Sequence, residues 1–409
     1  MGRLKTSYGK AEHVTAASAG FIETVVAAGS PAPMIVAFAL VGVALRLTVL
    51  RPGPSATAAG AIVMAIGIFG LAALQQIPAL HVWLTRPLAA ALLVTAALIG
   101  ASYGRSAVTG DFARHVASPL GRFAVGTWVA GVAVLARVEF LAFPEWRWLA
   151  ASLGVTAAVV WLAFLPLVLG GLRQILASED RRRSTGVILL ATVSTQSVAL
   201  VVLALLAPSE PRRWAVLALL CLGYALYGLG AVLIAQRYLR QPRFDWVEDW
   251  DSRNTILHGA LSITGLTAVT CATLPAAIPI ATWLCAAVLL ALVEGMEIGW
   301  LIARVRVLGW RRGVFTYGVA QWSRNFTFGM FYAFTLALHQ HATLTAAPAW
   351  MKAPQALIIA FGPYVVLAFL LLELGLFVAD RVDVQRPFRL LFSVPSGARP
   401  GERGVRGIR

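Results

Sequence analysis

The feature that most constrains this chain is a series of ten apolar segments, each close to the length that a helix needs to cross a lipid bilayer. A transmembrane helix needs about 20 mainly apolar residues. The segments lie at 57–75, 87–103, 123–143, 148–170, 186–207, 214–236, 255–274, 282–303, 318–338 and 356–378. Because hydrocarbon offers no hydrogen bonds to an open backbone, the segments predict an all-α polytopic membrane protein.

A shorter apolar segment precedes these ten. Residues 33–50 are apolar, but the segment is short and Arg46 lies near its end. We therefore expect an N-terminal extension over 1–54 that can hold an extra membrane helix, a ten-helix domain over 55–380 and a basic tail over 381–409.

The composition excludes most other classes of protein. Apolar residues make up 59% of the 409 residues and charged residues 13%, whereas soluble domains have about 45–50% and 25%. This excludes a soluble enzyme, a disordered chain and a secreted disulfide scaffold. The three cysteines lie inside apolar segments and no two histidines have a ligand spacing there, so we expect neither a metal nor a cofactor.

The positions of the arginines predict the orientation in the membrane. The net charge is +16, but the basic residues lie in short loops, which is typical of membrane topology rather than of nucleic-acid binding. The loops after the even-numbered segments, with the tail, hold 22 basic residues, whereas the opposite loops hold five. The positive-inside rule therefore places these loops and the C-terminus in the cytoplasm. We expect the membrane to be a plasma membrane or a bacterial-type inner membrane.

The same basic loops reveal an internal repeat. They begin near residues 104, 173, 237, 304 and 379. Each interval holds two apolar segments joined by a shorter turn, so the chain predicts five helical hairpins in a row.

Polar residues are concentrated in the odd-numbered segments. Examples are Thr195 and Gln196 in the polar run 192–197, and His258 in the seventh segment. Such side chains need partners or water inside a membrane, so we expect the odd helices to surround a central polar pore. The alternative is that each hydroxyl bonds to its own carbonyl four residues earlier.

Glycines are also concentrated in the odd segments, where they allow helices to bend or to approach closely. The candidate bends are Gly126, Gly131, Gly259, Gly265 and Gly329.

Few charged residues lie inside the segments. Arg137 and Arg324 are in odd segments, whereas Glu294, Glu297 and Glu373 are in even ones. Charges at this depth are costly, so each predicts a function or an ion pair. An arginine beside a water path attracts anions. For Arg324, an ion pair with Glu297 is the alternative.

Six stretches, in order along the chain, resemble the tellurite-resistance/dicarboxylate transporter family, whose plant relatives are the slow anion channels of guard cells. They are AIVMAIGIFG (61–70), GRFAVGTWVAGVAVLAR (121–137), LATVSTQSVAL (190–200), LGYALYGLGAVL (222–233), HGALSITGLTAVT (258–270) and QWSRNFTFGMFYAFT (321–335). The resemblance implies five bent inner helices around a pore, five outer helices that enclose them, and a homotrimer with one pore per subunit.

The resemblance also implies a phenylalanine gate. The family's Trp-x-x-x-Phe-x-x-Gly setting corresponds here to Trp322, Phe326 and Gly329, and Phe328 is the second candidate. This chain departs from the family at Thr327, where relatives often have proline.

The neighbouring Arg324 and Asn325 make the gate segment more polar than the family pattern. Both residues are therefore candidates for lining the pore, and the departures bear on the bend of the gate and on the substrate.

We therefore expect a non-enzymatic transporter of small anions, such as C4-dicarboxylates, tellurite, sulfite, nitrate or chloride, whose other contacts are lipid and copies of itself, with no nucleic acid. One alternative is a proton-coupled carrier that uses Glu294, Glu297 and Glu373. Another is a membrane-embedded Mg²⁺-dependent prenyl or phosphoalcohol transferase that uses the acidic loop Asp245–Asp251. A second carboxylate cluster, which such transferases normally need, is missing from the sequence.

Overall fold

The computed structural model describes residues 31–48, 54–177, 184–241, 244–341 and 349–381. In these ranges the chain is helical and contains no strand, which confirms the predicted all-α class. The predicted basic tail beyond Arg381 and residues 1–30 of the N-terminal extension lie outside the described residues.

Eight helical segments in the described ranges are long and apolar enough to cross a membrane. They are Thr57–Gln76, Pro78–Val108, Pro119–Ala142, Pro144–Ala177, Gly186–Leu205, Glu210–Leu239, Ala277–Val314 and Trp350–Arg381. The seventh and ninth predicted segments also form helices, α11 (Ile256–Cys271) and α13 (Val319–Gln340). These two are not among the eight, because α11 has only 16 residues and α13 carries many polar side chains.

The even-numbered helices are longer than the apolar segments that predicted them. They are α4 (Pro78–Val108), α8 (Arg147–Ala177), α10 (Glu210–Leu239), α12 (Ala277–Val314) and α14 (Ala349–Arg381). Their extra turns contain arginine, tryptophan and proline. These residues are not typical of the hydrocarbon core, so the predicted apolar segments left them out, but a helix tolerates them where it ends at the membrane surface.

The odd-numbered segments are composite helices. The first consists of η1 (Thr57–Ala59), α3 (Gly60–Ile68), the π-turn η2 (Phe69–Ala73) and η3 (Leu74–Gln76), and the third of α6 (Pro119–Ala124) and α7 (Gly126–Ala142). The fifth consists of η6 (Gly186–Leu189) and α9 (Leu190–Leu205), and η7 (Ser252–Thr255) precedes α11. Such 3₁₀ and π turns mark changes in helix direction.

Burial alternates along the chain. The apolar stretches of the first, third and fifth segments are 72%, 67% and 83% buried, whereas those of the five even helices are only 22–28% buried. We call α3, α7, α9, α11 and α13 the inner helices, and α4, α8, α10, α12 and α14 the outer helices.

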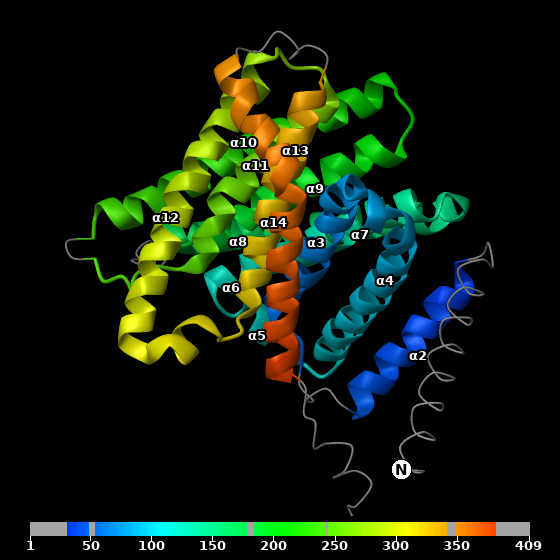
Figure 1. Ribbon diagram of the computed structural model, residues 1–409, viewed down its shortest axis with the longest axis horizontal. Helices are drawn as coiled ribbons and strands as arrows, with labels where there is room; N and C mark the ends of the chain where they lie inside the picture. Colours follow the sequence, from blue (N-terminus) through cyan, green and yellow to red (C-terminus); the bar gives the residue numbers. More distant parts are fainter. Residues whose placement is uncertain (1–30, 49–53, 178–183, 242–243, 342–348, 382–409) are drawn as a thin grey trace, which may run out of the picture.

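The inner helices form a closed ring in the described part of the chain. Helix α3 packs against α7, α7 against α9, α9 against α11, α11 against α13, and α13 returns to α3. Each outer helix covers its neighbours in this ring; α8, for example, packs against both α7 and α9, and α10 against α9 and α11. Helix α2 (Ala32–Thr48), which corresponds to the weaker predicted segment, packs on α4 (Figure 1).

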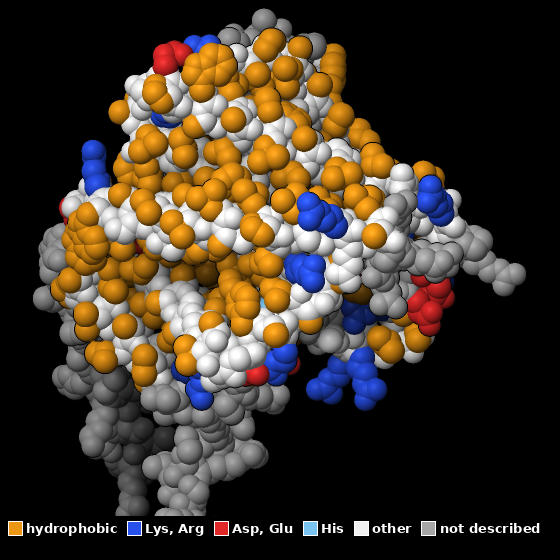
Figure 2. Space-filling model, turned by 180° about the vertical axis from the view of Figure 1, so that it is seen from behind, with side chains coloured by type: hydrophobic (Ala, Val, Ile, Leu, Met, Phe, Trp, Pro, Cys, Tyr) orange, Lys and Arg blue, Asp and Glu red, His pale blue; other side chains and the backbone are white. Residues whose placement is uncertain are grey.

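The outer surface is apolar over a wide area (Figure 2). Large side chains of α8 such as Val155, Val159 and Leu162 are more than half exposed. A soluble protein rarely exposes so much apolar surface. This surface fits a lipid bilayer, as expected for a multi-pass membrane protein.

The predicted helix-bending glycines mostly serve close packing instead. A Cβ atom at Gly126 would lie 2.9 Å from the carbonyl oxygen of Leu190, and one at Gly259 2.1 Å from Cγ2 of Thr327. Gly131, Gly265 and Gly329 face neighbouring inner helices in the same way. Only Gly126 lies at an interruption, between α6 and α7. These glycines therefore let the ring close tightly.

Candidate functional site

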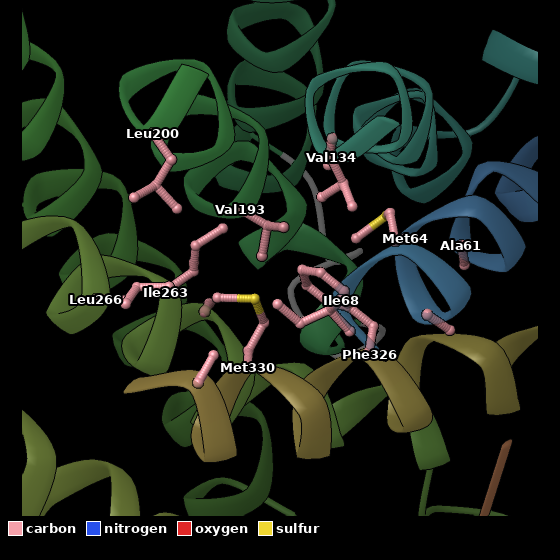
Figure 3. Packing of buried hydrophobic residues seen from close by; sticks show 14 of the residues in the cluster. Ala61, Met64, Ile68, Val134, Val193, Leu200, Ile263, Leu266, Phe326 and Met330 are labelled. Atoms are coloured by element: carbon pink, nitrogen blue, oxygen red, sulfur yellow. The ribbon is translucent and has the colours of Figure 1, made fainter. Parts of the chain in front are cut away.

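The centre of the ring is filled by apolar side chains from all five inner helices. Figure 3 shows these side chains pointing toward one another. They include Met64, Ile68, Val134, Val193, Leu200, Ile263, Leu266, Phe326 and Met330, all buried. We call this group the central cluster.

Phe326, the first candidate for the gate, belongs to the central cluster. Its side chain is 1% exposed and lies beside Ile68 of α3 (Figure 3). Helices α3 and α13 come this close because of Gly329, where a Cβ atom would be 2.6 Å from Cγ2 of Ile68. The position of Phe326 is therefore suited to blocking the axis of the ring.

Phe328, the second candidate, points elsewhere. Its ring stacks on Phe369 of α14, with centroids 4.9 Å apart, and Arg324 lies over its face. Residues two apart on a helix point in different directions. Phe328 therefore packs between an inner and an outer helix, and this position does not suit a gate.

The side chains of Thr195 and Gln196 also turn toward outer helices. Thr195 Oγ1 accepts a hydrogen bond from Trp161 Nε1 of α8 at 3.1 Å and donates to the carbonyl of Ala191. Gln196 Nε2 donates to the carbonyl of Leu219 on α10 at 3.0 Å. Both side chains therefore form hydrogen bonds to outer helices, and their predicted role in lining a central path stays a prediction.

Arg324 lies at the centre of a charged cluster between α11, α12 and α13. Its guanidinium forms an ion pair with Glu294, and a second nitrogen is 3.7 Å from Glu297. Trp250 Nε1 donates to the Glu297 carboxylate at 2.6 Å. Two carboxylates thus surround one guanidinium, so the predicted attraction of pore anions by Arg324 does not fit its contacts.

His258 and Asn325 extend this cluster rather than the central cluster. His258 is completely buried; its Nε2 lies 3.4 Å from Thr327 Oγ1 and 3.9 Å from Glu294. Asn325 Nδ2 donates to the carbonyl of Phe369 on α14 at 3.3 Å. These contacts join α13 to α11 and to α14, and the pore-lining role of both residues stays a prediction.

Arg137 differs from Arg324 because no acidic side chain in the described ranges pairs with it. It is half-buried on α7, three residues after Val134 of the central cluster. Residues three apart lie on neighbouring parts of one helix face. Among the described residues, no hydrogen bond or ion pair engages its guanidinium. Arg137 therefore remains the candidate for attracting anions.

Glu139 is a second isolated charged group on α7. Its side chain is completely buried, and neither carboxylate oxygen has a hydrogen-bond partner within the described ranges. It is two residues from Arg137, so the two side chains point to different sides of the helix.

The acidic loop is held together by its own hydrogen bonds. Asp245 Oδ1 accepts from the backbone of Val247 at 2.7 Å, and Asp249 Oδ2 accepts from the backbone of Asp245 at 2.7 Å. Asp251 forms an ion pair with Arg253, and this carboxylate raises the Arg253 pKa. Within the described residues, no three metal-ligating side chains converge.

Sequence reasoning missed most of the central cluster. Met64 and Ile68, or Phe326 and Met330, have the four-residue spacing of one helix face. This spacing is visible in the sequence. However, an inner helix is buried on all sides, so its apolar periodicity does not show which face points toward the ring axis.

Comparison with known proteins adds no family assignment. No protein-family model matches the chain, and no curated protein matches it significantly.

Proposed function

We propose that this protein transports small anions across a membrane along the axis of the inner-helix ring. The central cluster carries the proposal, because buried apolar side chains from all five inner helices, Phe326 among them, point toward one another. A large apolar ring in a narrow path excludes water and ions, and its removal or rotation opens the path.

The sign of the transported ion follows from charge. Arg137 has no ion-pair partner in the described part of the chain, lies one turn from the central cluster and is half-buried. An uncompensated guanidinium near a low-dielectric path raises the local potential and favours anions. The resemblance to the tellurite-resistance/dicarboxylate family supports the same class of substrate.

The further elements of the proposal are ten membrane crossings, with α11 and α13 as the seventh and ninth, and a homotrimer with one path per subunit. The basic loops and the C-terminus face the cytoplasm across a plasma or inner membrane. The excess of arginine on one side of the membrane supports this orientation.

The proton-coupled carrier is a variant of the same function. Glu294 and Glu297 lie near Arg324, but Glu373 of α14 is 3% exposed and its Oε1 has no hydrogen-bond partner among the described residues. Glu373 is therefore the carboxylate to test. No such observation favours the transferase, because the acidic loop uses its carboxylates in internal hydrogen bonds.

The test is anion flux into liposomes that contain the purified protein. Wild type and Phe326→Ala are compared with chloride, nitrate, sulfite, tellurite and malate, with and without a pH gradient. We expect electrogenic anion flux that is larger in Phe326→Ala. Flux that requires the pH gradient and disappears in Glu373→Gln would indicate the carrier. Absence of flux of every anion in both proteins would contradict the proposed function.

A further inference from the structure

A groove of about 310 Å³ interrupts the outer layer between α2, α4 and α14. Its floor is formed by two inner helices, through Ile62 and Ile66 of α3 and Val319 and Trp322 of α13. The volume is at the lower end of the range for ligand pockets, about 300–1,000 Å³. At this place the outer helices leave the inner ring uncovered.

The walls of the groove are apolar along most of its length. They include Leu98 and Ile99 of α4, Leu374 and Phe377 of α14, and Leu45 of α2. Leu374 and Arg381 both line the groove and are seven residues apart on α14, which corresponds to about 10 Å along a helix. The groove is therefore elongated along the helix axes, as an acyl chain in a bilayer is.

One end of the groove is cationic. Arg46 in the last turns of α2 and Arg381 at the end of α14 both line it, together with Ser55. Arg381 Nε is 3.1 Å from a carboxylate oxygen of Asp380, but the side chains of Arg381 and Asp380 are 40% and 45% exposed. Such an exposed pair contributes little and leaves the guanidinium accessible.

Aromatic side chains stand next to this cationic end. Trp322 Nε1 donates to the Tyr317 hydroxyl at 3.2 Å, and both rings pack edge-on against Phe377. Tryptophan and tyrosine are enriched at the level of lipid headgroups. Arg46 and Arg381 are therefore at the depth where a lipid phosphate lies, on the side of the basic loops.

We propose that this groove binds one anionic phospholipid, with its phosphate at Arg46 and Arg381 and one acyl chain along α3, α4 and α14. The apolar walls select a lipid over a soluble anion, and the two guanidiniums select an anionic headgroup over a zwitterionic one. This proposal does not depend on whether the ring conducts anions.

Native mass spectrometry of the purified full chain tests the headgroup. Phosphatidylglycerol is compared with phosphatidylcholine of the same acyl chains. We expect preferential retention of phosphatidylglycerol, reduced about fivefold by Arg46→Gln and about fivefold by Arg381→Gln. Arg306→Gln removes the same charge from an exposed position outside the groove and should leave retention unchanged. Equal retention of both lipids, unaffected by the arginine variants, would overturn the proposal.

A second pair of variants tests the acyl chain. Thr95 lines the groove, whereas Ala97 on the same helix is exposed and does not line it. Thr95→Trp should fill the groove and reduce retention of both lipids, whereas Ala97→Trp should not. A photoreactive phosphatidylglycerol should cross-link to Leu98 or Ile99 in wild type.

The same measurements identify other occupants. Displacement of phosphatidylglycerol by inorganic phosphate alone would show an anion site and contradict the lipid. Cross-linking of α2 to a second copy of the chain, with no retained lipid, would show a subunit interface and would also contradict it.

Discussion

Arg324 of inner helix α13 forms an ion pair with Glu294 of outer helix α12. The pair joins the two layers of the molecule, and Glu297 and His258 lie close to the same groups. Two carboxylates neutralise the positive charge of this guanidinium, so it attracts an anion on the ring axis only weakly. The structure thus separates two arginines that look alike in the sequence, and Arg137 keeps the role of attracting anions in our proposal.

For Arg324 we predict a loss of stability. Arg324→Gln leaves Glu294 and Glu297 without their cation and should cost about 3 kcal/mol, because a broken buried pair leaves an uncompensated charge. Thermal unfolding in detergent measures the effect. The double variant Arg324→Gln with Glu294→Gln should recover part of the lost stability, because it removes one of the two unpaired carboxylates. Comparing the two single variants with the double variant measures the coupling between the residues. A single variant as stable as wild type would contradict the assignment.

For Phe326 we predict a gain of conductance. Phe326→Ala removes the aromatic ring from the named members of the central cluster and should raise anion conductance severalfold in planar bilayers. Phe328→Ala is the matched control, because Phe328 stacks on Phe369 outside the ring, and it should leave conductance per molecule unchanged. If Phe326 is only a packing residue, its truncation should cost about 3–5 kcal/mol and conductance should not rise. The two interpretations thus differ in sign.

For Arg137 we predict a salt-dependent loss of flux without a loss of stability. Arg137→Gln removes an uncompensated positive charge, so anion flux at low ionic strength should fall about tenfold. The difference from wild type should shrink in high salt, because screening weakens the field of the arginine. The free energy of unfolding should change less than in Arg324→Gln, since no ion pair of Arg137 is broken among the described residues. Unchanged flux at low salt would remove Arg137 from the proposal.

The orientation predicts which loops are reached from outside the cell. Val108, 90% exposed at the end of α4, should be cytoplasmic, and the exposed Ala207 between α9 and α10 should be external. In a chain with its three native cysteines replaced, Ala207→Cys should react with an impermeant thiol reagent in intact cells. Val108→Cys should react only after permeabilisation. The reverse pattern would invert the topology.

His115 predicts a pH dependence of stability. It lies in α5 (Phe112–Val116), its Nδ1 is 2.7 Å from Thr57 Oγ1, and its pKa is lowered by burial and then by Arg114. The unfolded chain therefore takes up a proton that the folded chain resists. The free energy of unfolding should thus be independent of this group well above pH 6.5 and should decrease as the pH falls below it.

Thermal unfolding between pH 8 and pH 5 measures this dependence. His115→Gln should flatten the decrease. An unchanged slope in His115→Gln would assign the acid sensitivity to other groups.

The order and positions of the helices could be predicted from the sequence. Each of the ten predicted apolar segments forms a helix, because hydrocarbon forces the backbone to bond within its own segment. The ends were less predictable, as α4 shows: it begins at Pro78, nine residues before the predicted segment. Arg86 and His81 lie in these turns, and a helix near the membrane surface tolerates such polar residues.

The direction of each side chain could not be predicted. Thr195 and Gln196 belong to a polar run that suggested a central path, yet their partners are Trp161 and Leu219 on outer helices. The inner helices are buried on every side, so no amphipathic pattern distinguishes the axis of the ring from the contacts between layers.

The sequence by itself determined that this is a helical membrane protein, where its helices lie and which loops are basic, because those properties depend on local hydropathy and charge. Only the tertiary structure decided that five inner helices close into a ring, that Phe326 rather than Phe328 faces its centre, and that Arg324 is paired with Glu294 while Arg137 is not. These choices depend on which surfaces of distant helices pack together. That packing is set by close approaches such as Gly329 against Ile68, between residues far apart in the chain.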